Sequence, residues 1–166
     1  LKNALEKTIF AISSSEVRNE LSGALFSFNN PEKGFLTIVG TDSYRLTEIH
    51  TKMKEIFSDE QKNIIVPVRT LQEILRIIQG EEKKNNEVGI YLSDNQILFT
   101  YQETEIFSRV INGEYPDYRQ TIPKTTETEI LINKNELLRT VKAAGFFSKI
   151  GINAVSYTHL RAHETS

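Results

Sequence analysis

The sequence has no cysteine in its 166 residues. This absence excludes disulfides, thiolate metal ligands and a cysteine nucleophile, and it fits a reducing compartment, so we expect a cytoplasmic location. Long apolar runs are also missing: the longest are about five residues, whereas a membrane helix needs about 20. No signal-peptide pattern is visible. The chain begins at Leu1 inside an amphipathic pattern, without an initiator Met, and we interpret it as a fragment of a longer protein.

A strong charge imbalance is likewise absent, because the net charge is only −2. The sequence as a whole therefore carries no basic signal for nucleic acid, although a local basic face remains possible. Hydrophobic residues make up 39% and charged residues 25%, a composition that predicts a packed core rather than disorder.

Motifs that specify a reaction are missing as well. There is no G-x-S-x-G elbow, no Walker lysine loop and no glycine-rich dinucleotide turn. The raw material for acid–base chemistry exists, but none of it lies in such a motif: Asp42, His50, Glu114, Asp117 and Tyr118. His159 and His163 have the i, i+4 spacing of two zinc ligands, but no third ligand is evident nearby. We therefore predict a protein that is not an enzyme and that needs no cofactor and no metal.

What the sequence does contain is a repeated helical pattern. Three amphipathic stripes recur with the same internal spacing at intervals of 66 residues, which indicates a repeated supersecondary unit. Chance agreement between amphipathic helices is the alternative. The stripes are Leu5, Ile9 and Ile12, then Leu71, Leu75 and Ile78, then Leu137, Val141 and Ala144. The second helix begins either with Thr70 and Glu73 as a capping box or earlier, after Pro67, and Asn133 with Glu136 is predicted to cap the third.

Short strands fill the intervals between these helices. Turn signals at residues 30–34 and at Asp94–Asn95 separate them, which indicates antiparallel hairpins. The unit reads β-α-β-β-β, seen once without its first strand, once whole and once barely begun. The predicted class is α+β, with antiparallel sheets and helices on one side. The expected strands are 21–29, 35–41, 44–50, 63–66, 87–93, 96–101, 105–110 and 129–132.

Three strings in this framework resemble a known family. They are TDSYRL at 41–46, IIVP at 64–67 and NGEYPDYRQTIP at 112–123, and their order and spacing resemble the middle domain of the bacterial DNA polymerase III β subunit, the sliding clamp. The resemblance runs from Leu1 to about Val155. It implies a middle clamp domain at 1–124 without its first strand and the beginning of the third clamp domain at 125–155. The tail at 156–166 does not fit the family, and we expect it to be a disordered artefact.

The resemblance implies a function without covalent chemistry. Members of this family are head-to-tail homodimeric rings whose helices face double-stranded DNA, and they act as processivity factors of the replicative polymerase. They also dock short, partly hydrophobic peptide motifs of the polymerase, the clamp loader and repair proteins. A protein-interaction module that does not bind DNA is the alternative function.

By the same resemblance, one group of residues faces DNA and contacts phosphates without reading sequence. It comprises Ser14, Ser15, Arg18, Asn19 and Arg69. Asn19 and Glu20 stand where many relatives have aromatic residues, so base stacking is not available there. The polar helix faces carry a modest basic signal that fits this role, with Glu6 and Glu73 interspersed, and an ordinary solvated helix face is the alternative. The basic residues are Lys2, Lys7, Arg69, Arg76, Arg139, Lys142 and Lys149.

A second group is expected to form a peptide-binding pocket. In it Leu21, Leu46 and Pro116 supply apolar walls, and Arg45 donates hydrogen bonds to peptide carbonyls. A structural salt bridge from Arg45 to Asp42 or Glu48 is the alternative. The pocket residues implied by the resemblance are Leu21, Thr41, Ser43, Tyr44, Arg45, Leu46, Pro116, Gln120 and Thr121.

The crowded loop GEYPDYRQTIP at 113–123 is read as the connector between the two domains. Pro116 and Pro123 fix φ and remove two backbone donors, which suits a segment that must not join a sheet. Tyr115 and Tyr118 are predicted to anchor the loop against the domain, in preference to contacting a ligand. Gly113 is expected to complete the turn out of the preceding strand.

Overall fold

The computed structural model describes residues 1–14, 17–55, 60–80 and 87–146. The chain divides into two compact units, Leu1–Tyr118 and a second that begins at Arg119, and each is described by itself. No helix in the described part of the chain is long and apolar enough to cross a membrane.

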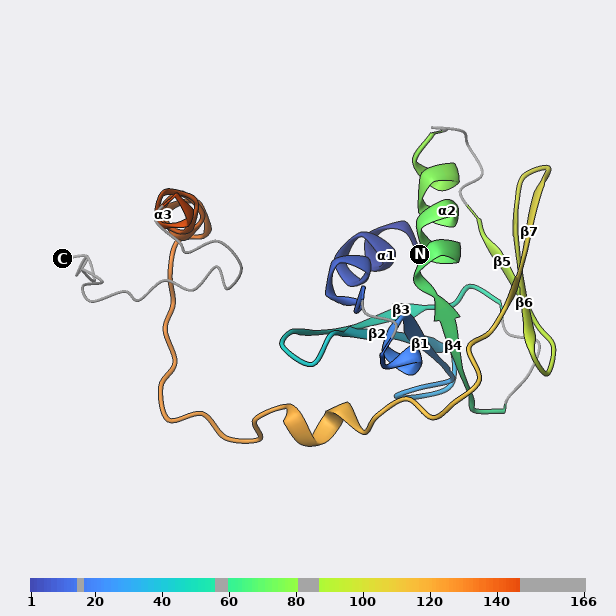
Figure 1. The fold of residues 1–166 in the computed structure, drawn as a ribbon, viewed down its shortest axis with the longest axis horizontal. Helices are drawn as coiled ribbons and strands as arrows, with labels where there is room; N and C mark the ends of the chain where they lie inside the picture. Colours follow the sequence, from blue (N-terminus) through green and yellow to red (C-terminus); the bar gives the residue numbers. More distant parts are fainter. Residues whose placement is uncertain (15–16, 56–59, 81–86, 147–166) are drawn as a thin grey trace. The chain divides into compact units, whose positions relative to one another are not determined.

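The first unit alternates short helices with two groups of strands (Figure 1). Its elements, in chain order, are α1 (Lys2–Thr8), the 3-10 helices η1 (Ile9–Ala11) and η2 (Asn19–Leu21), β1 (Gly23–Phe28), β2 (Phe35–Thr41), β3 (Leu46–Lys52), β4 (Lys62–Pro67), α2 (Val68–Gln79), β5 (Gly89–Leu92), β6 (Gln96–Tyr101) and β7 (Thr104–Arg109). The 3-10 helix η3 (Tyr118–Thr121) begins at the last residue of the first unit. Helix α3 (Lys134–Gly145) belongs to the second unit.

Both sheets are antiparallel, as the hairpin signals predicted. The four-stranded sheet has the order β3-β2-β1-β4, and the three-stranded sheet has the order β5-β6-β7. In the larger sheet β4, the first strand of the second repeat, pairs with β1 of the first repeat, from Gly23 opposite Pro67 to Phe28 opposite Lys62. The two repeats therefore share one sheet. The predicted α+β class is confirmed.

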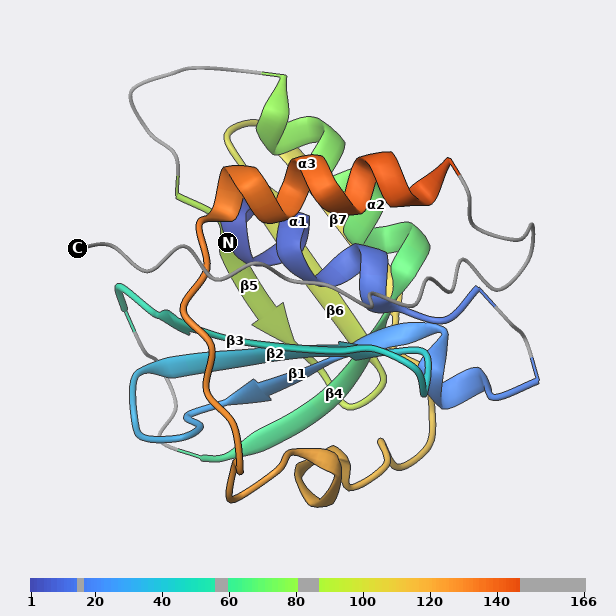
Figure 2. The same ribbon diagram turned by 90° about the vertical axis from the view of Figure 1, so that its left-hand side faces the viewer.

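Helices α1 and α2 lie on one face of the four-stranded sheet (Figure 2). α2 begins at Val68, directly after Pro67, whose φ of −57° suits a helix start, and Pro67 makes no side-chain cap. Of the two helix starts that the sequence left open, the earlier one after Pro67 is therefore observed, and the Thr70 capping box is not. The Thr70 hydroxyl instead lies 2.7 Å from the hydroxyl of Ser108 in β7.

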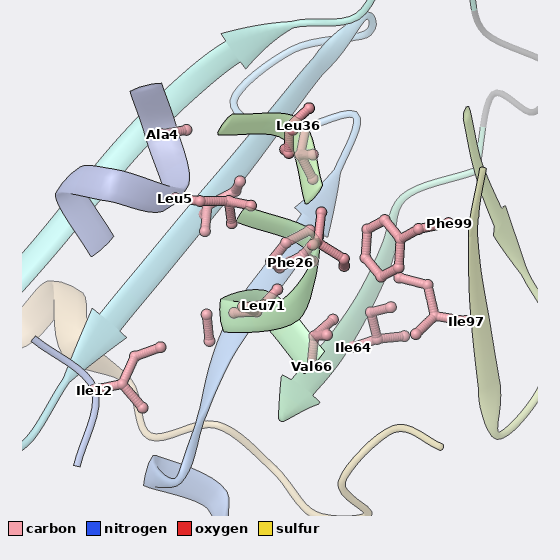
Figure 3. Packing of buried hydrophobic residues seen from close by; sticks show 14 of the residues in the cluster. Ala4, Leu5, Ile12, Phe26, Leu36, Ile64, Val66, Leu71, Ile97 and Phe99 are labelled. Carbon is pink, nitrogen blue, oxygen red and sulfur yellow. The ribbon is translucent and has the colours of Figure 1, made fainter. Parts of the chain in front are cut away.

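The main core lies between the helices and the two sheets (Figure 3). The repeat predicted from the stripes is visible in its burial, because Leu5 and Leu71, 66 residues apart, are both fully buried. The third matched pair, Ile12 and Ile78, is also buried, and the second, Ile9 and Leu75, is partly buried. The stripes of α1 and α2 thus occupy equivalent core positions.

A smaller cluster lies on the opposite face of the four-stranded sheet. Leu25 of β1 and Val39 of β2 are cross-strand partners, and Tyr118 packs against them, with Leu46 and Tyr115 at the margin. Because β1 and β2 carry buried side chains on both faces, these two strands are the most enclosed part of the unit.

Three predictions need correction. Residue 21 lies in η2 rather than in a strand, because the chain turns there before Gly23 pairs with Pro67. Tyr44 belongs to a turn, and β3 begins at Leu46. The expected strand at 129–132 is not formed. A strand needs a partner for its backbone groups, and the described residues provide none there.

The third helix is where the sequence placed it. The Asn133 side chain accepts hydrogen bonds from the backbone N–H groups of Asn135 and Glu136, so its capping role is confirmed. The apolar stripe of α3 is exposed: Leu137 and Val141 retain 40% and 47% of their surface. This helix is therefore formed by local signals and its cap rather than by packing within the described residues.

Candidate functional site

The turn between β2 and β3 is held by a network of short-range hydrogen bonds. The Asp42 carboxylate accepts from the backbone N–H groups of Tyr44 and Arg45, at 3.0 and 2.9 Å. The Thr41 hydroxyl accepts from Ser43 N–H at 3.1 Å and donates to the Arg45 carbonyl at 2.8 Å. Ser43 has a φ of +77°, a conformation that side chains rarely adopt. The turn is therefore a rigid platform that holds Tyr44 and Arg45 in solvent.

The carboxyl group of Asp42 is more acidic than usual. Burial raises its pKa, but the hydrogen bonds from the Arg45 and Tyr44 backbones and the nearby Arg45 side chain outweigh burial, and the net pKa lies below its usual range. Asp42 is thus an ionised acceptor around which the turn is organised.

Arg45 makes an ion pair with Asp42, with 2.9 Å between Nε and Oδ2. The structural salt bridge considered from the sequence therefore exists with Asp42 and not with Glu48, whose carboxylate lies 3.3 Å from His50 and also accepts from Tyr118. The Arg45 side chain remains 59% exposed. Because the ion pair uses Nε, the terminal nitrogens of the Arg45 guanidinium can still donate hydrogen bonds to a ligand.

Phe10 is the neighbour that sequence reasoning missed. The Arg45 guanidinium carbon lies 5.7 Å from the centroid of the Phe10 ring, within the range of a cation–π contact. Phe10 lies in η1, off the apolar stripe, 35 positions before Arg45 in the sequence. No local pattern could have signalled this contact, because it depends on how α1 packs on β2.

The loop that follows β7 is anchored by its two tyrosines, as predicted. Tyr118 is buried against Leu25 and Val39, and its hydroxyl donates to the Glu48 carboxylate. The Tyr115 hydroxyl lies 3.4 Å from the Val39 carbonyl. Burial is the main reason that the Tyr115 pKa is raised, so this phenol is neutral across the physiological range. Gly113 has a φ of +146°, which explains the glycine in this turn.

The structure brings together most of the predicted pocket residues that lie in the first unit. Thr41 through Leu46 surround the β2–β3 turn, and Leu46 packs on the cluster that Tyr115 and Tyr118 cover. Pro116 lies exposed between these tyrosines. Leu21 is only 2% exposed, so it offers little surface to a ligand. Gln120 and Thr121 lie beyond the first unit, in η3, where both are exposed.

The predicted DNA-side residues lie at two backbone segments that are bonded together. The N–H of Val68 donates to the Ser22 carbonyl at 3.1 Å, and the N–H of Ser13 donates to the Leu21 carbonyl at 3.1 Å. The first bond joins residue 22 to the start of α2, where Arg69 follows Val68, and the second links residue 13 to residue 21. Four members of the group are exposed, namely Ser14, Arg18, Asn19 and Arg69, and Ser15 lies outside the described residues.

The polar helix faces carry a balanced charge. Arg76 pairs with Glu73 at 2.9 Å, and Gln79 of α2 donates to Glu6 of α1 at 3.0 Å. Lys2 and Lys7 are exposed on α1. The faces are therefore polar with modest positive character, consistent with weak contacts rather than a tight anion site.

Features of a metal centre are not found in the described residues, which contain no group of three or more candidate ligands among His, Asp and Glu. His159 and His163, as well as the tail at 156–166 and Lys149, lie outside the described residues. Glu114 and Asp117 are exposed in the loop rather than gathered in a cleft.

Fold and site together define a class: a domain of two repeats, α-β-β-β followed by β-α-β-β-β, with their helices on one side of the larger sheet and an exposed turn beside a loop anchored by two tyrosines. Comparison with known proteins identifies this class. The family model for the central domain of the DNA polymerase III beta subunit matches residues 1–117. The chain therefore belongs to the DNA polymerase III beta subunit family.

Individual relatives agree. The chain is 33% identical to the beta sliding clamp of Bacillus subtilis over 93% of its own length and 39% of the relative. A crystal structure of the B. subtilis clamp superposes with a TM-score of 0.80 at 32% identity, covering 90% of this chain and 38% of that chain. A putative beta subunit of Eubacterium rectale gives 0.79 at 33% identity, covering 90% and 39%. The chain thus spans about 39% of the curated relative's length.

Proposed function

We propose that this chain is part of a sliding clamp, a non-catalytic processivity factor of the replicative DNA polymerase in the bacterial cytoplasm. The observation that carries the proposal is the match of residues 1–117 to the central domain of the beta subunit family. In the complete ring, helices α1 and α2 face double-stranded DNA. The ring closes head to tail from two identical subunits, and the protein holds its polymerase on the template by topology rather than by tight binding.

The DNA side of this proposal rests on the exposed end of α2 and the loop bonded to it. Arg18 and Arg69 lie on segments joined by the Val68-to-Ser22 hydrogen bond, and with the exposed Ser14 and Asn19 they would offer one contact region to DNA. Ser15, which the resemblance also assigns to the DNA side, lies outside the described residues. Phosphate contacts from such residues carry no sequence information, which sliding requires. The near-balanced helix faces keep these contacts weak.

A chimera tests the clamp function. Residues 1–118 would replace the matching segment of the B. subtilis clamp, and the chimera would be loaded onto nicked circular DNA by the B. subtilis loader. A clamp remains on the circle and leaves once the circle is linearised, because its hold is topological. Equal retention on circular and linear DNA would contradict the proposal and favour a protein-interaction module. The parental B. subtilis clamp, measured in the same way, shows how much clamp is released when the circle is linearised.

The same protein would dock peptide motifs of the polymerase, the clamp loader and repair proteins. The proposed site consists of the β2–β3 turn, Leu46 and the exposed Pro116, and Leu21, Gln120 and Thr121 complete the set given by the resemblance. Its support is the combination of an apolar margin with the exposed, charged Arg45.

Fluorescence anisotropy tests the docking site directly. The probe is a fluorescein-labelled hexapeptide of alternating leucine and glutamine, which presents apolar side chains on one side and leaves its backbone carbonyls available. Saturable binding is expected to weaken when the leucines are replaced by serine and when Arg45 is replaced by Ala. A Tyr91→Ala variant, altered on the separate three-stranded sheet, serves as the control and is expected to bind normally.

A further inference from the structure

The ring of Phe10 is held in a defined place although it faces solvent. It is 57% exposed, whereas the next two residues, Ala11 and Ile12, are buried. The turn of η1 is closed by the Ile12 N–H donating to the Ile9 carbonyl at 3.2 Å. The backbone that carries the ring is therefore fixed by its buried neighbours, although the ring itself contributes little to the core.

A glycine on β2 allows this placement. A Cβ at Gly40 would lie 2.8 Å from Thr8 Cγ2 and 2.9 Å from the Thr8 carbonyl oxygen, closer than atoms can pack, and 3.1 Å from Ile12 Cγ1, a tight contact. Gly40 thus lets the segment from Thr8 to Ile12 approach the strand directly before the Thr41–Leu46 turn. The same approach sets the ring of Phe10 next to the side chain of Arg45.

Arg45 is consequently held from two sides. Asp42 binds its Nε at 2.9 Å, and the Phe10 ring lies 5.7 Å from its guanidinium carbon. An arginine side chain has many rotamers, and fixing them on binding opposes affinity. Two contacts that fix the guanidinium before a ligand arrives reduce that entropic cost.

We propose that Phe10 is a positioning residue for Arg45, and that its ring and Asp42 together orient the guanidinium so that its terminal N–H groups meet the carbonyls of an extended peptide. This inference rests on the proposed docking function. It adds to the docking site a residue of η1, the 3-10 helix that directly follows α1. Because the contact depends on an aromatic face, Tyr can replace Phe10 and Leu cannot.

The first test measures the Phe10–Arg45 contact in the full 166-residue chain without a ligand. Protons near an aromatic face are shifted upfield, so the Arg45 Hδ resonances are expected upfield in the wild type and in Phe10→Tyr. In Phe10→Leu they should return to ordinary values. Unchanged Arg45 resonances in Phe10→Leu would overturn the inference.

The second test measures affinity with the alternating leucine–glutamine hexapeptide. Phe10→Leu is expected to weaken binding about two- to fivefold, the range of an exposed cation–π contact, and Phe10→Tyr to restore it. In an Arg45→Ala background Phe10→Leu should have no further effect, because the two residues act as one unit. Phe107→Leu, exposed on β7, is the matched control.

The affinity measurements distinguish failure of the docking role of Arg45 from failure of the positioning role of Phe10. If Arg45→Ala leaves the hexapeptide affinity unchanged, the proposed docking role of Arg45 fails, and the inference fails with it. If Arg45→Ala weakens binding but Phe10→Leu does not, docking stands and the positioning role of Phe10 is overturned. Thermal melting of each variant checks that the fold persists, which the exposure of Phe10 leads us to expect.

Discussion

The rings of Phe26 and Phe99 meet edge to face, with 6.3 Å between their centroids and an interplanar angle of 83°. Phe26 belongs to β1 in the first repeat, and Phe99 belongs to β6 in the second. Both side chains are almost fully buried. This contact joins the two sheets, so the two repeats share one core (Figure 3).

Replacing Phe99 with Ala is therefore expected to lower the free energy of unfolding by about 3–5 kcal/mol, because it removes buried apolar surface and leaves a cavity. Urea denaturation followed by circular dichroism measures the change. Phe107→Ala is the control: this ring is 68% exposed on the neighbouring strand, and we expect a change of at most about 0.5 kcal/mol. Equal losses for the two variants would contradict a core shared between the sheets.

Gly40→Ala is expected to destabilise the first unit by about 1–3 kcal/mol, because the added methyl group would lie 2.9 Å from the Thr8 carbonyl oxygen and must push α1 away from β2. Thermal melting provides the measurement. Gly80→Ala, at the end of α2, would place its methyl group at an ordinary contact distance of 3.7 Å from the Arg76 and Ile77 carbonyl oxygens and should be neutral or stabilising by up to about 1 kcal/mol. A neutral Gly40→Ala would show that α1 does not need this close approach.

Tyr118→Phe removes the hydroxyl that donates to Glu48 but keeps the ring packed on Leu25 and Val39. We expect a loss of about 0.5–1.5 kcal/mol, measured by urea denaturation, and a larger loss of about 3–5 kcal/mol for Tyr118→Ala. Tyr44→Phe, on a fully exposed ring, should change nothing. If Tyr118→Ala proved as mild as Tyr118→Phe, the packing of the ring would not anchor the loop.

The lowered pKa of Asp42 makes stability depend on pH with a definite sign. A carboxyl whose pKa is lower in the folded state stabilises the protein fully above its unfolded value, about 3.9, and loses that contribution as pH falls through the folded value. Wild type should therefore be more stable than Asp42→Asn at pH 7, and the difference should shrink below about pH 4. Unfolding curves at several pH values test this, and a difference that grew on acidification would contradict it.

For the proposed DNA contact, Arg69→Ala in the chimeric ring is expected to weaken binding to duplex DNA at low salt. The slope of log K against log salt should fall by about 0.9, the value for one phosphate contact. Fluorescence anisotropy at several salt concentrations provides the slope. Arg109→Ala, exposed on β7, is the matched control and should keep the parental slope. An unchanged slope in Arg69→Ala would remove this residue from the DNA side.

Local patterns in the sequence determined much of this protein. Apolar spacing located α2 and α3, and the repeat of 66 residues anticipated that Leu5 and Leu71 occupy matched core positions. β2 and β6 were predicted with their observed bounds, and a turn signal directly precedes each of them. The strings at 41–46 and 112–123 indicated the family that the comparison with known proteins established.

Only the tertiary structure decided the contacts between distant segments. The sequence left open whether Arg45 pairs with Asp42 or Glu48. In the folded protein Arg45 pairs with Asp42, whereas the Glu48 carboxylate contacts His50 and accepts a hydrogen bond from Tyr118. The residues at 129–132 have strand-like composition but form no strand within the described part of the chain, since a strand exists only with a partner. Phe10 carried no signal at all, because its place beside Arg45 follows from α1 packing against Gly40. Spacing along the chain fixes which face a residue occupies, and packing fixes what that face meets.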